Sequence, residues 1–307
     1  MLLRRRLPCS SGGRRARPRE PRPHRASSAG RLSGPRGIEY QRTARLITSP
    51  VSLIVPCYNE EQRLDRHRFL GLSRAPNLDL LLVDDGSKDG TGRVVDELVE
   101  AGQGKIRALS LPKNVGKGEA VRQGLLRAIS DGAQIIGYAD ADLSTSPEQL
   151  LKLLAYLDDP HVQAVIGARV MLVGRRIERK RVRHWLGRIY ASMAASILRM
   201  PFYDTQCGAK FFRVNTLLGK TLALPFTSRW AFDLELLGRL LVGVGGERGL
   251  TPGELIEVPL DEWIDVGGSK LHFGSMAKTL VDLVKIEVEM ERLRAESKNH
   301  GRRGDIG

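Results

Sequence analysis

The sequence predicts an α/β protein built around a central, mainly parallel sheet. Five short, nearly continuous apolar runs, which suit strands covered on both faces, alternate with segments of helical spacing. Polar residues cluster directly after four of these runs. Because ligands of such sheets bind beyond the carboxyl ends of the strands, these clusters indicate a binding site at one edge.

The predicted elements follow in strict alternation from residue 50. The apolar runs predict strands at 51–56, 78–85, 106–112, 133–140 and 164–169, and helical spacing predicts helices at 60–73, 91–101, 117–131 and 147–158. Pro147, placed behind the capping residue Ser146, is typical of a first helical turn. Further helical patterns occupy 184–200 and, as a long charged helix, about 274–296.

The positive charge is concentrated in the first fifty residues. With 307 residues and 41% apolar content, the chain can bury a core of one or two domains. Residues 1–50 contain thirteen Arg, no Lys and two Glu, which is +11 of the formal +14. We therefore predict a disordered basic segment at residues 1–49 and no nucleic-acid partner. An organelle transit peptide is the alternative for this Arg-rich, acid-poor segment.

Three further features concern membranes and redox state. No apolar run reaches 18 residues, so we expect no membrane-spanning helix and no secretory signal. Residues 169–188 hold eight Lys or Arg against one Glu, and the 184–200 pattern follows. That helix either lies on an anionic membrane or packs on its own protein, and the Arg-rich segment upstream favours the membrane. The three cysteines show no metal-ligand or disulfide spacing, which fits a reducing compartment.

The Asp140-Ala141-Asp142 sequence, directly after a predicted strand, is the strongest chemical signal. Two carboxylates that flank one small residue can bind a hard divalent cation such as Mg²⁺ or Mn²⁺, which bridges two phosphates. The cation offsets charge on a leaving diphosphate. A solvated turn is the alternative, and the position after a strand and before a capped helix favours metal binding.

Two other strand ends carry groups that suit a nucleotide. Asp85 can accept a hydrogen bond from a base or ribose, or it can stabilise a turn with the following Gly-Ser. Residues 113–118 supply two lysines and two glycines before a helix, which suits a diphosphate. Neither a P-loop nor the dinucleotide fingerprint Gly-x-Gly-x-x-Gly after the first strand is found, which argues against a dinucleotide oxidoreductase.

The second half of the chain has weaker candidates. Polar or aromatic residues interrupt apolar surroundings at Asp204, Gln206, Trp230, Asp233 and Glu235. Asp233 and Glu235 either act in a site or face solvent from a helix. The glycine pair before Lys270 suits a loop that closes a cation over phosphates, or an ordinary surface loop.

The ordered motifs VSLIVPCYNEE, LLLVDDGSKDGT, NVGKGEAVRQG and YADADLSTSPE resemble family-two glycosyltransferases of the GT-A fold. With DTQCGAKFFR, RWAFDLELL and GGSKL, the chain is similar to dolichyl-phosphate β-glucosyltransferases and prokaryotic polyprenyl-phosphate relatives. The resemblance spans 50–285 and implies a nucleotide-binding half at 50–169. It also implies an acceptor half at 170–285 with a membrane-surface helix, and a charged tail at 286–307.

The resemblance also implies roles for individual residues. Those expected to bind the nucleotide are Pro56, Tyr58, Glu60, Asp85, Lys117, Asp140 and Ala141. Asp142, with Asp140, would bind Mg²⁺ or Mn²⁺, and Arg169 and Lys270 would meet phosphates. Two departures stand out. Ser144 replaces an amide ligand common in mannosyl-transferring relatives, and the N-terminal membrane helix of the eukaryotic enzymes is not found.

The implied reaction transfers glucose from UDP-glucose to a polyprenyl (dolichyl-type) phosphate, with inversion, at the cytoplasmic membrane face. A phosphate acceptor, with a second pKa of about 6, needs no strong base. A sugar hydroxyl would need one, and Asp233 is then the candidate beside the catalytic Asp140 and Asp142. The competing hypotheses are transfer to a sugar hydroxyl, mannosyl transfer to a lipid phosphate, nucleotidyl transfer and nucleic-acid binding through the Arg-rich segment.

Overall fold

The computed structural model describes residues 48–171, 174, 176–178, 190, 192–264, 266 and 276–304. Nearly all of the predicted basic segment, most of the basic stretch 169–188 and Lys270 lie outside the described residues. No helix of the described residues has the length and apolar character needed to cross a bilayer.

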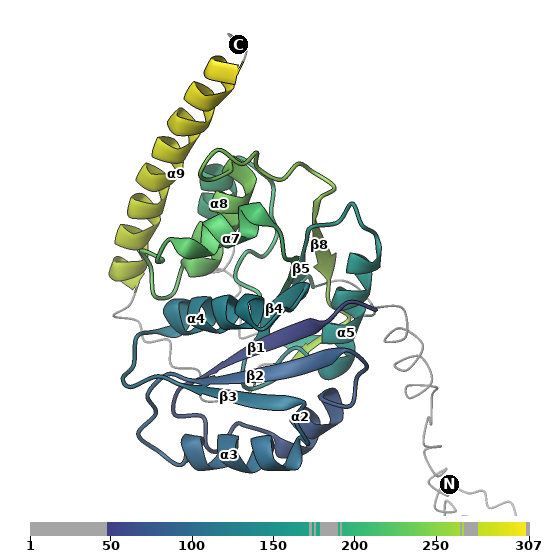
Figure 1. Ribbon diagram of the computed structural model, residues 1–307. Coiled ribbons are helices and arrows are strands. Elements are labelled where there is room, and N and C mark those ends of the chain that lie inside the picture. The colour runs from purple at the N-terminus through teal and green to yellow at the C-terminus, as the bar shows by residue number, and fades with distance from the viewer. Residues whose placement is uncertain are drawn as a thin grey trace, which may run out of the picture. The chain divides into compact units, whose positions relative to one another are not determined.

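A seven-stranded sheet in the order β3-β2-β1-β4-β7-β5-β8 forms the centre of the protein (Figure 1). Its strands are β1 Val51–Cys57, β2 Leu78–Asp84, β3 Ile106–Ser110, β4 Ile135–Ala139, β5 Ala164–Ala168, β7 Ala209–Arg213 and β8 Leu255–Pro259. Strands β1 to β4 pair in parallel, as do β5 and β8, whereas β7 runs antiparallel between β4 and β5. The predicted α/β fold with a mainly parallel sheet is confirmed, with all five predicted strands. A separate parallel pair joins β6 Arg176–Glu178 to β9 Glu262–Ile264.

Helices cover both faces of the sheet. They are α2 Arg66–Leu72, α3 Thr91–Ala101, α4 Lys117–Ser130, α5 Pro147–Ala155 followed by a short 3₁₀ helix, α7 Thr216–Ala223, α8 Phe232–Val242 and α9 Met276–Gly304. Helices α2, α3 and α5 pack on one face, and α4, α7 and α8 pack on the other (Figure 1). Along β1, Leu53 and Val55 join the first layer while Ile54 joins the second. This alternation explains why the strand sequence is apolar throughout.

Helix α2 begins later than its sequence pattern predicts. Residues 61–63 form a turn, and the helix starts after Asp65, whose side chain accepts a hydrogen bond from the backbone N–H of Arg68 at 3.1 Å. An Asp at this position satisfies an N–H group that has no partner inside the helix. The residues before Asp65 therefore belong to the loop that follows β1.

The C-terminal part of the chain is helical and packed. Helix α9 continues across residue 285, where the sequence suggests that a charged tail begins, and Ile286, Met290 and Leu293 are buried beyond it. Within the helix predicted at 184–200, residues 190 and 192–200 are described, and 192–198 are helical. Ala194, Ile197 and Leu198 are buried in the same layer as α8. This part of that helix packs against its own protein, which was the alternative to lying on a membrane.

Candidate active site

The loops that follow β1 and β2 are hydrogen-bonded to each other at the carboxyl edge of the sheet. The two strands end in register, and the backbone N–H of Asp85 donates to the carbonyl of Cys57 at 2.8 Å. Next along the loop, the N–H of Asn59 donates to Ser87 Oγ at 3.0 Å, and that of Glu60 donates to Thr91 Oγ1 at 2.7 Å. The predicted nucleoside-binding residues Tyr58, Glu60 and Asp85 therefore lie on two joined loops, and Pro56 lies at the end of β1 just before them. Pro56, Tyr58 and Glu60 are partly exposed.

Asp85 binds the loop before α4. Its carboxylate accepts hydrogen bonds from the backbone N–H groups of Val115 at 2.6 Å and Gly116 at 2.9 Å, and from Asn114 Nδ2 at 2.9 Å. Burial raises the pKa of Asp85, although these N–H donors oppose the shift. The turn that follows β2 is stabilised by Asp84 and not by Asp85, because Asp84 accepts a hydrogen bond from the N–H of Ser87 at 3.0 Å. In the structure Asp85 therefore fixes the glycine- and lysine-containing loop expected to meet a diphosphate.

Lys117 and Asp140 form an ion pair between the first turn of α4 and the end of β4. Lys117 Nζ lies 2.5 Å from Asp140 Oδ1. Burial alone would raise the pKa of Asp140, but the charges of Lys117, Arg169 and Lys210 hold it below its usual value. The same contact raises the pKa of Lys117 against the effect of burial. Both groups are therefore charged at neutral pH, as a site for a metal-bound diphosphate requires.

Asp142 lies beside Asp140 and is held by other partners. It forms an ion pair with Arg63, and its Oδ1 accepts hydrogen bonds from the N–H of Ser144 at 3.0 Å and from Ser144 Oγ at 2.8 Å. No three His, Cys, Asp or Glu side chains of the described residues are grouped to hold a metal. Mg²⁺ is commonly bound by one or two carboxylates together with substrate phosphates. Asp140 and Asp142 fit that kind of site, in which the diphosphate completes the ligand set.

Residues 204–208 bring a second polar cluster to Asp140. The N–H of Asp140 donates to the carbonyl of Gly208 at 3.1 Å. Asp204 accepts two hydrogen bonds from the Arg169 guanidinium, at 2.5 Å from Nε and 2.8 Å from Nη2. Asp204 keeps the pKa of Arg169 above its usual value, although burial disfavours the charge. Arg169, expected to meet a phosphate, is close enough to Asp140 for its charge to lower the pKa of that carboxyl. Gln206 donates to Tyr190 Oη at 3.0 Å.

Gly208 packs directly against the carboxylate of Asp140. A Cβ atom at this position would overlap the carboxylate of Asp140, so Gly208→Ala must displace that side chain. Because a shift of about 1 Å in a catalytic group costs up to roughly 10²-fold in rate, we expect kcat/KM to fall about 10- to 100-fold. Gly219→Ala on α7, where no atom lies within 4 Å of the added methyl group, is the matched control. Steady-state kinetics of both variants check this, and full activity in Gly208→Ala would contradict the packing described.

Asp233 is buried on the first turn of α8 and accepts hydrogen bonds from Tyr138 Oη and Lys210 Nζ. Lys210 is fully buried near the start of β7 and also donates to the carbonyl of Cys207 at 2.6 Å. Burial, followed by the charge of Asp233, raises the pKa of Tyr138 well above its usual value. The alternative in which Asp233 and Glu235 face solvent is wrong, because both are buried. Lys210 and Tyr138 lie within the quoted motifs, but no local pattern predicts their contact with Asp233.

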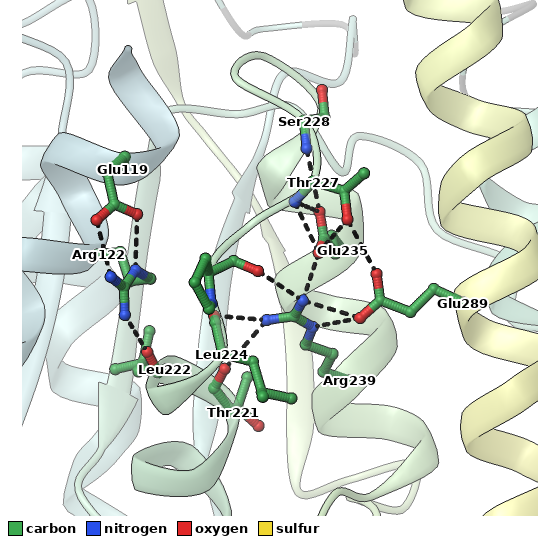
Figure 2. A network of polar contacts seen from close by, with 11 residues as sticks. Glu119, Arg122, Thr221, Leu222, Leu224, Thr227, Ser228, Glu235, Arg239 and Glu289 are labelled. Atoms are coloured by element: carbon green, nitrogen blue, oxygen red, sulfur yellow. Dashed lines mark hydrogen bonds and ion pairs between the residues drawn. The ribbon is translucent and has the colours of Figure 1, made fainter. Parts of the chain in front are cut away.

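A second buried network joins α8 to its neighbours (Figure 2). The Arg239 guanidinium contacts Glu235 at 2.5 Å and Glu289 of α9 at 2.8 Å. It also donates to the carbonyls of Leu224 at 2.8 Å and Pro225 at 3.0 Å, after the end of α7. It donates as well to the carbonyl of Thr221 within α7 at 3.3 Å, so this buried arginine links α7, α8 and α9.

Burial raises the pKa of Glu235 to about 7, against the opposing effects of Arg239 and the Thr227 N–H, and the nearby Glu289 adds to the rise. The folded state then holds a proton between about pH 4.5 and 7 that the unfolded state has lost. The free energy of unfolding should therefore fall as pH rises through this window, by on the order of 3 kcal/mol. Glu235→Gln should remove this slope. Urea unfolding at a series of pH values measures it, and parallel curves for the two proteins would contradict the assignment.

Comparison with known proteins is consistent with this geometry. The model of the glycosyl transferase family 2 matches residues 52–217. The chain is 32% identical over 244 residues to the dolichyl-phosphate β-glucosyltransferase of Homo sapiens, covering 73% of this chain and 70% of the relative. It is 26% identical over 200 residues to the polyprenol monophosphomannose synthase of Mycolicibacterium smegmatis, covering 63% and 73%.

The fold has solved counterparts. Glucosyl-3-phosphoglycerate synthase from Mycobacterium tuberculosis, crystallised with Mn²⁺, UDP-glucose and phosphoglyceric acid, superposes with a TM-score of 0.57. The match covers 81% of this chain and 83% of that chain at 18% identity, and it shows a common GT-A fold. With the family match over more than half of its length, the chain belongs to glycosyl transferase family 2 and is a glycosyltransferase.

Proposed function

We propose that the protein transfers a hexose from a nucleotide diphosphate sugar to a polyprenyl phosphate, with UDP-glucose as donor and inversion to a β-linked product. The carboxylate pair of Asp140 and Asp142, flanked by Lys117 and Arg63 at the edge of the sheet, is the observation that carries the proposal. The names of the human and mycobacterial relatives support a lipid-phosphate acceptor. A polyprenyl phosphate is held in a bilayer, so the enzyme would act at a membrane surface, on its cytoplasmic face.

On the donor side, the loop fixed by Asp85 would present backbone N–H groups at the start of α4, where the helix dipole also favours an anion. Lys117 would add a positive charge beside the diphosphate. Asp142 and Asp140 would hold Mg²⁺ or Mn²⁺, whose chemistry there is to stabilise the negative charge of the departing UDP.

On the acceptor side, the burial and hydrogen bonding of Asp233 favour a phosphate acceptor over a sugar hydroxyl. Its carboxylate is buried and already accepts from Lys210 and Tyr138, which makes it a weak candidate for a general base. A phosphate monoester is anionic at neutral pH and can attack without a base. Arg169, which lies near Asp140, would help to position that phosphate.

Transfer assays with labelled donors test the proposal. We would incubate the full chain with Mg²⁺, detergent-dispersed polyprenyl phosphate and labelled UDP-glucose or GDP-mannose, and then extract the lipid. We expect label from UDP-glucose in the organic phase, an equal amount of released UDP and a β anomeric coupling in the product. Label confined to the aqueous phase with every donor would overturn the lipid acceptor, and release of pyrophosphate would indicate nucleotidyl transfer. Transfer to free sugars that Asp233→Asn abolishes would favour the hydroxyl reaction.

A further inference from the structure

Most of the large exposed apolar side chains of the described residues lie on α9 or in the segment between α7 and α8. Seven large apolar side chains are exposed, at Tyr156, Met171, Leu224, Trp230, Val281, Val284 and Val288. Three of them lie on α9 with exposed fractions of 54–66%, and two lie in the segment that connects α7 to α8. Scattered single apolar residues need no explanation, but a group of this kind indicates an interaction surface.

Helix α9 has two apolar faces. Leu283, Ile286, Met290 and Leu293 are buried in the layer that contains α8. Val281, Val284 and Val288 recur at a spacing of three and four residues, so they form a stripe on the opposite side of the helix. A helix that only covers a globular core has a polar outer face. The outer stripe of α9 therefore requires a different partner.

Two cations, Lys285 and Arg292, lie beside this stripe, and Arg292 also contacts Glu296 at 3.6 Å. Lys285 and Arg292 fall on the same side of α9, and with Val288 and Leu224 they line a surface hollow of about 380 Å³. We call Val281, Val284, Lys285, Val288 and Arg292 the outer face of α9.

The acidic groups at the edges of this face have partners within the protein. Glu289 contacts Arg239, and Asp282 accepts from Ser228 Oγ at 2.7 Å. Glu291 is paired with Arg199 and Arg294, each at 2.6 Å. Apolar side chains with adjacent cations and neutralised acids suit a membrane surface that contains anionic lipids.

The outer face is also connected to the candidate active site. The segment that carries Trp230, which is 48% exposed, contacts the loop before α4, because Arg229 Nε donates to the carbonyl of Val115 at 3.0 Å. The same segment bonds α9 through Ser228 and Asp282. A surface that touches the outer face of α9 and Trp230 would therefore lie close to the loop expected to meet the diphosphate.

We propose that the outer face of α9 docks on an anionic lipid bilayer and delivers the lipid acceptor to the site. The delivery step rests on the proposed function, whereas the docking itself does not. The proposal assigns membrane contact to α9 rather than to the segment 184–200, whose described part is packed on the protein.

A solvent-sensitive fluorophore attached at position 284 tests the contact directly. Cys57 and Cys207 are buried, so the full chain with Cys9→Ser can be labelled at Val284→Cys, with Tyr156→Cys as the exposed control on another part of the surface. Vesicles of phosphatidylcholine with phosphatidylserine should shift the emission to the blue at position 284 and leave it unchanged at position 156. Sedimentation with vesicles without a shift at 284 would assign binding to another segment and overturn the proposal. A shift that depends on protein concentration without vesicles would indicate a second copy and also overturn it.

A double substitution separates docking from chemistry. Val284→Asp with Val288→Asp should lower vesicle binding at least about 10-fold, because each charge opposes insertion, and should lower transfer to a bilayer-embedded acceptor similarly. Transfer to a short-chain acceptor in detergent should be unchanged, and Tyr156→Asp should behave as wild type in both assays. Unchanged vesicle binding in the double variant would overturn the docking surface. Absence of transfer in every wild-type assay, with the shift at position 284 retained, would overturn the proposed function alone.

Discussion

Asp142→Ala should lower metal-dependent turnover by about 10²- to 10³-fold while leaving the protein folded. The carboxylate is expected to hold the cation that stabilises the leaving diphosphate, and loss of one such electrostatic contact costs about 10²- to 10³-fold in rate. The fold should persist because Arg63, the ion-pair partner of Asp142, also contacts Glu60 at 3.2 Å. Initial rates at increasing Mg²⁺ and Mn²⁺, with circular dichroism of the same samples, measure both expectations.

Asp79→Ala is the matched control for this prediction. Asp79 is exposed at the opposite end of β2 from the site and pairs with Lys105 at 2.9 Å. Its removal should change kcat/KM less than about two-fold, since exposed ion pairs contribute at most about 1 kcal/mol and this one is remote from the site. Full turnover by Asp142→Ala, or by the wild type in excess chelator, would refute the role assigned to the carboxylate pair.

Lys210→Met should destabilise the protein by about 3–5 kcal/mol. Lys210 is fully buried, and its removal leaves the buried Asp233 carboxylate without its counter-charge. The second variant, Lys210→Met with Asp233→Asn, should recover most of this loss, because the amide is neutral and still accepts from Tyr138 Oη. Urea denaturation of the wild type, the two single variants and the double variant gives the coupling free energy of the pair.

The outcome that would contradict this ion pair is additivity. If the losses in the two single variants sum to that of the double variant, the stabilising contact of Lys210 is with the carbonyl of Cys207 and not with Asp233. A coupling near zero would also remove the reason given above for regarding Asp233 as a weak base.

Strands β1, β2, β4 and β5 were predictable because they are buried on both faces, and continuous apolar runs are unusual outside such strands. Strand β3 lies at the edge of the sheet and is partly exposed, and its shorter apolar pattern was still found close to its observed bounds. The grouping of polar residues after strands likewise located Asp85, Lys117, Asp140 and Asp142 at one edge. The roles of these residues in binding remain predictions.

The remainder of the site depends on pairings that no local pattern contains. Strand β7 was not predicted because Lys210 interrupts its apolar run, and a buried lysine is favourable only with Asp233, which comes from another element. Arg169 and Asp204 were both selected as candidates, but their mutual contact requires β5 and β7 to be neighbours. The hydrogen bonds between Asp85 and the loop at 114–116 depend in the same way on the parallel pairing of β2 and β3.

The antiparallel position of β7 has a consequence for the order in which the protein forms during synthesis. β4 and β5 have no direct pairing with each other, and β7, which is translated after both, lies between them. Pairing β4 with β7 closes the long stretch of chain between them, which is slow compared with the pairing of β1 with β2, since those two strands follow each other directly. A nascent chain in which Gly208 and β7 have not yet been synthesised would lack the hydrogen bond from the N–H of Asp140 to the carbonyl of Gly208. Such an intermediate could pair β1, β2, β3 and β4, but β5 would still lack its place in the sheet.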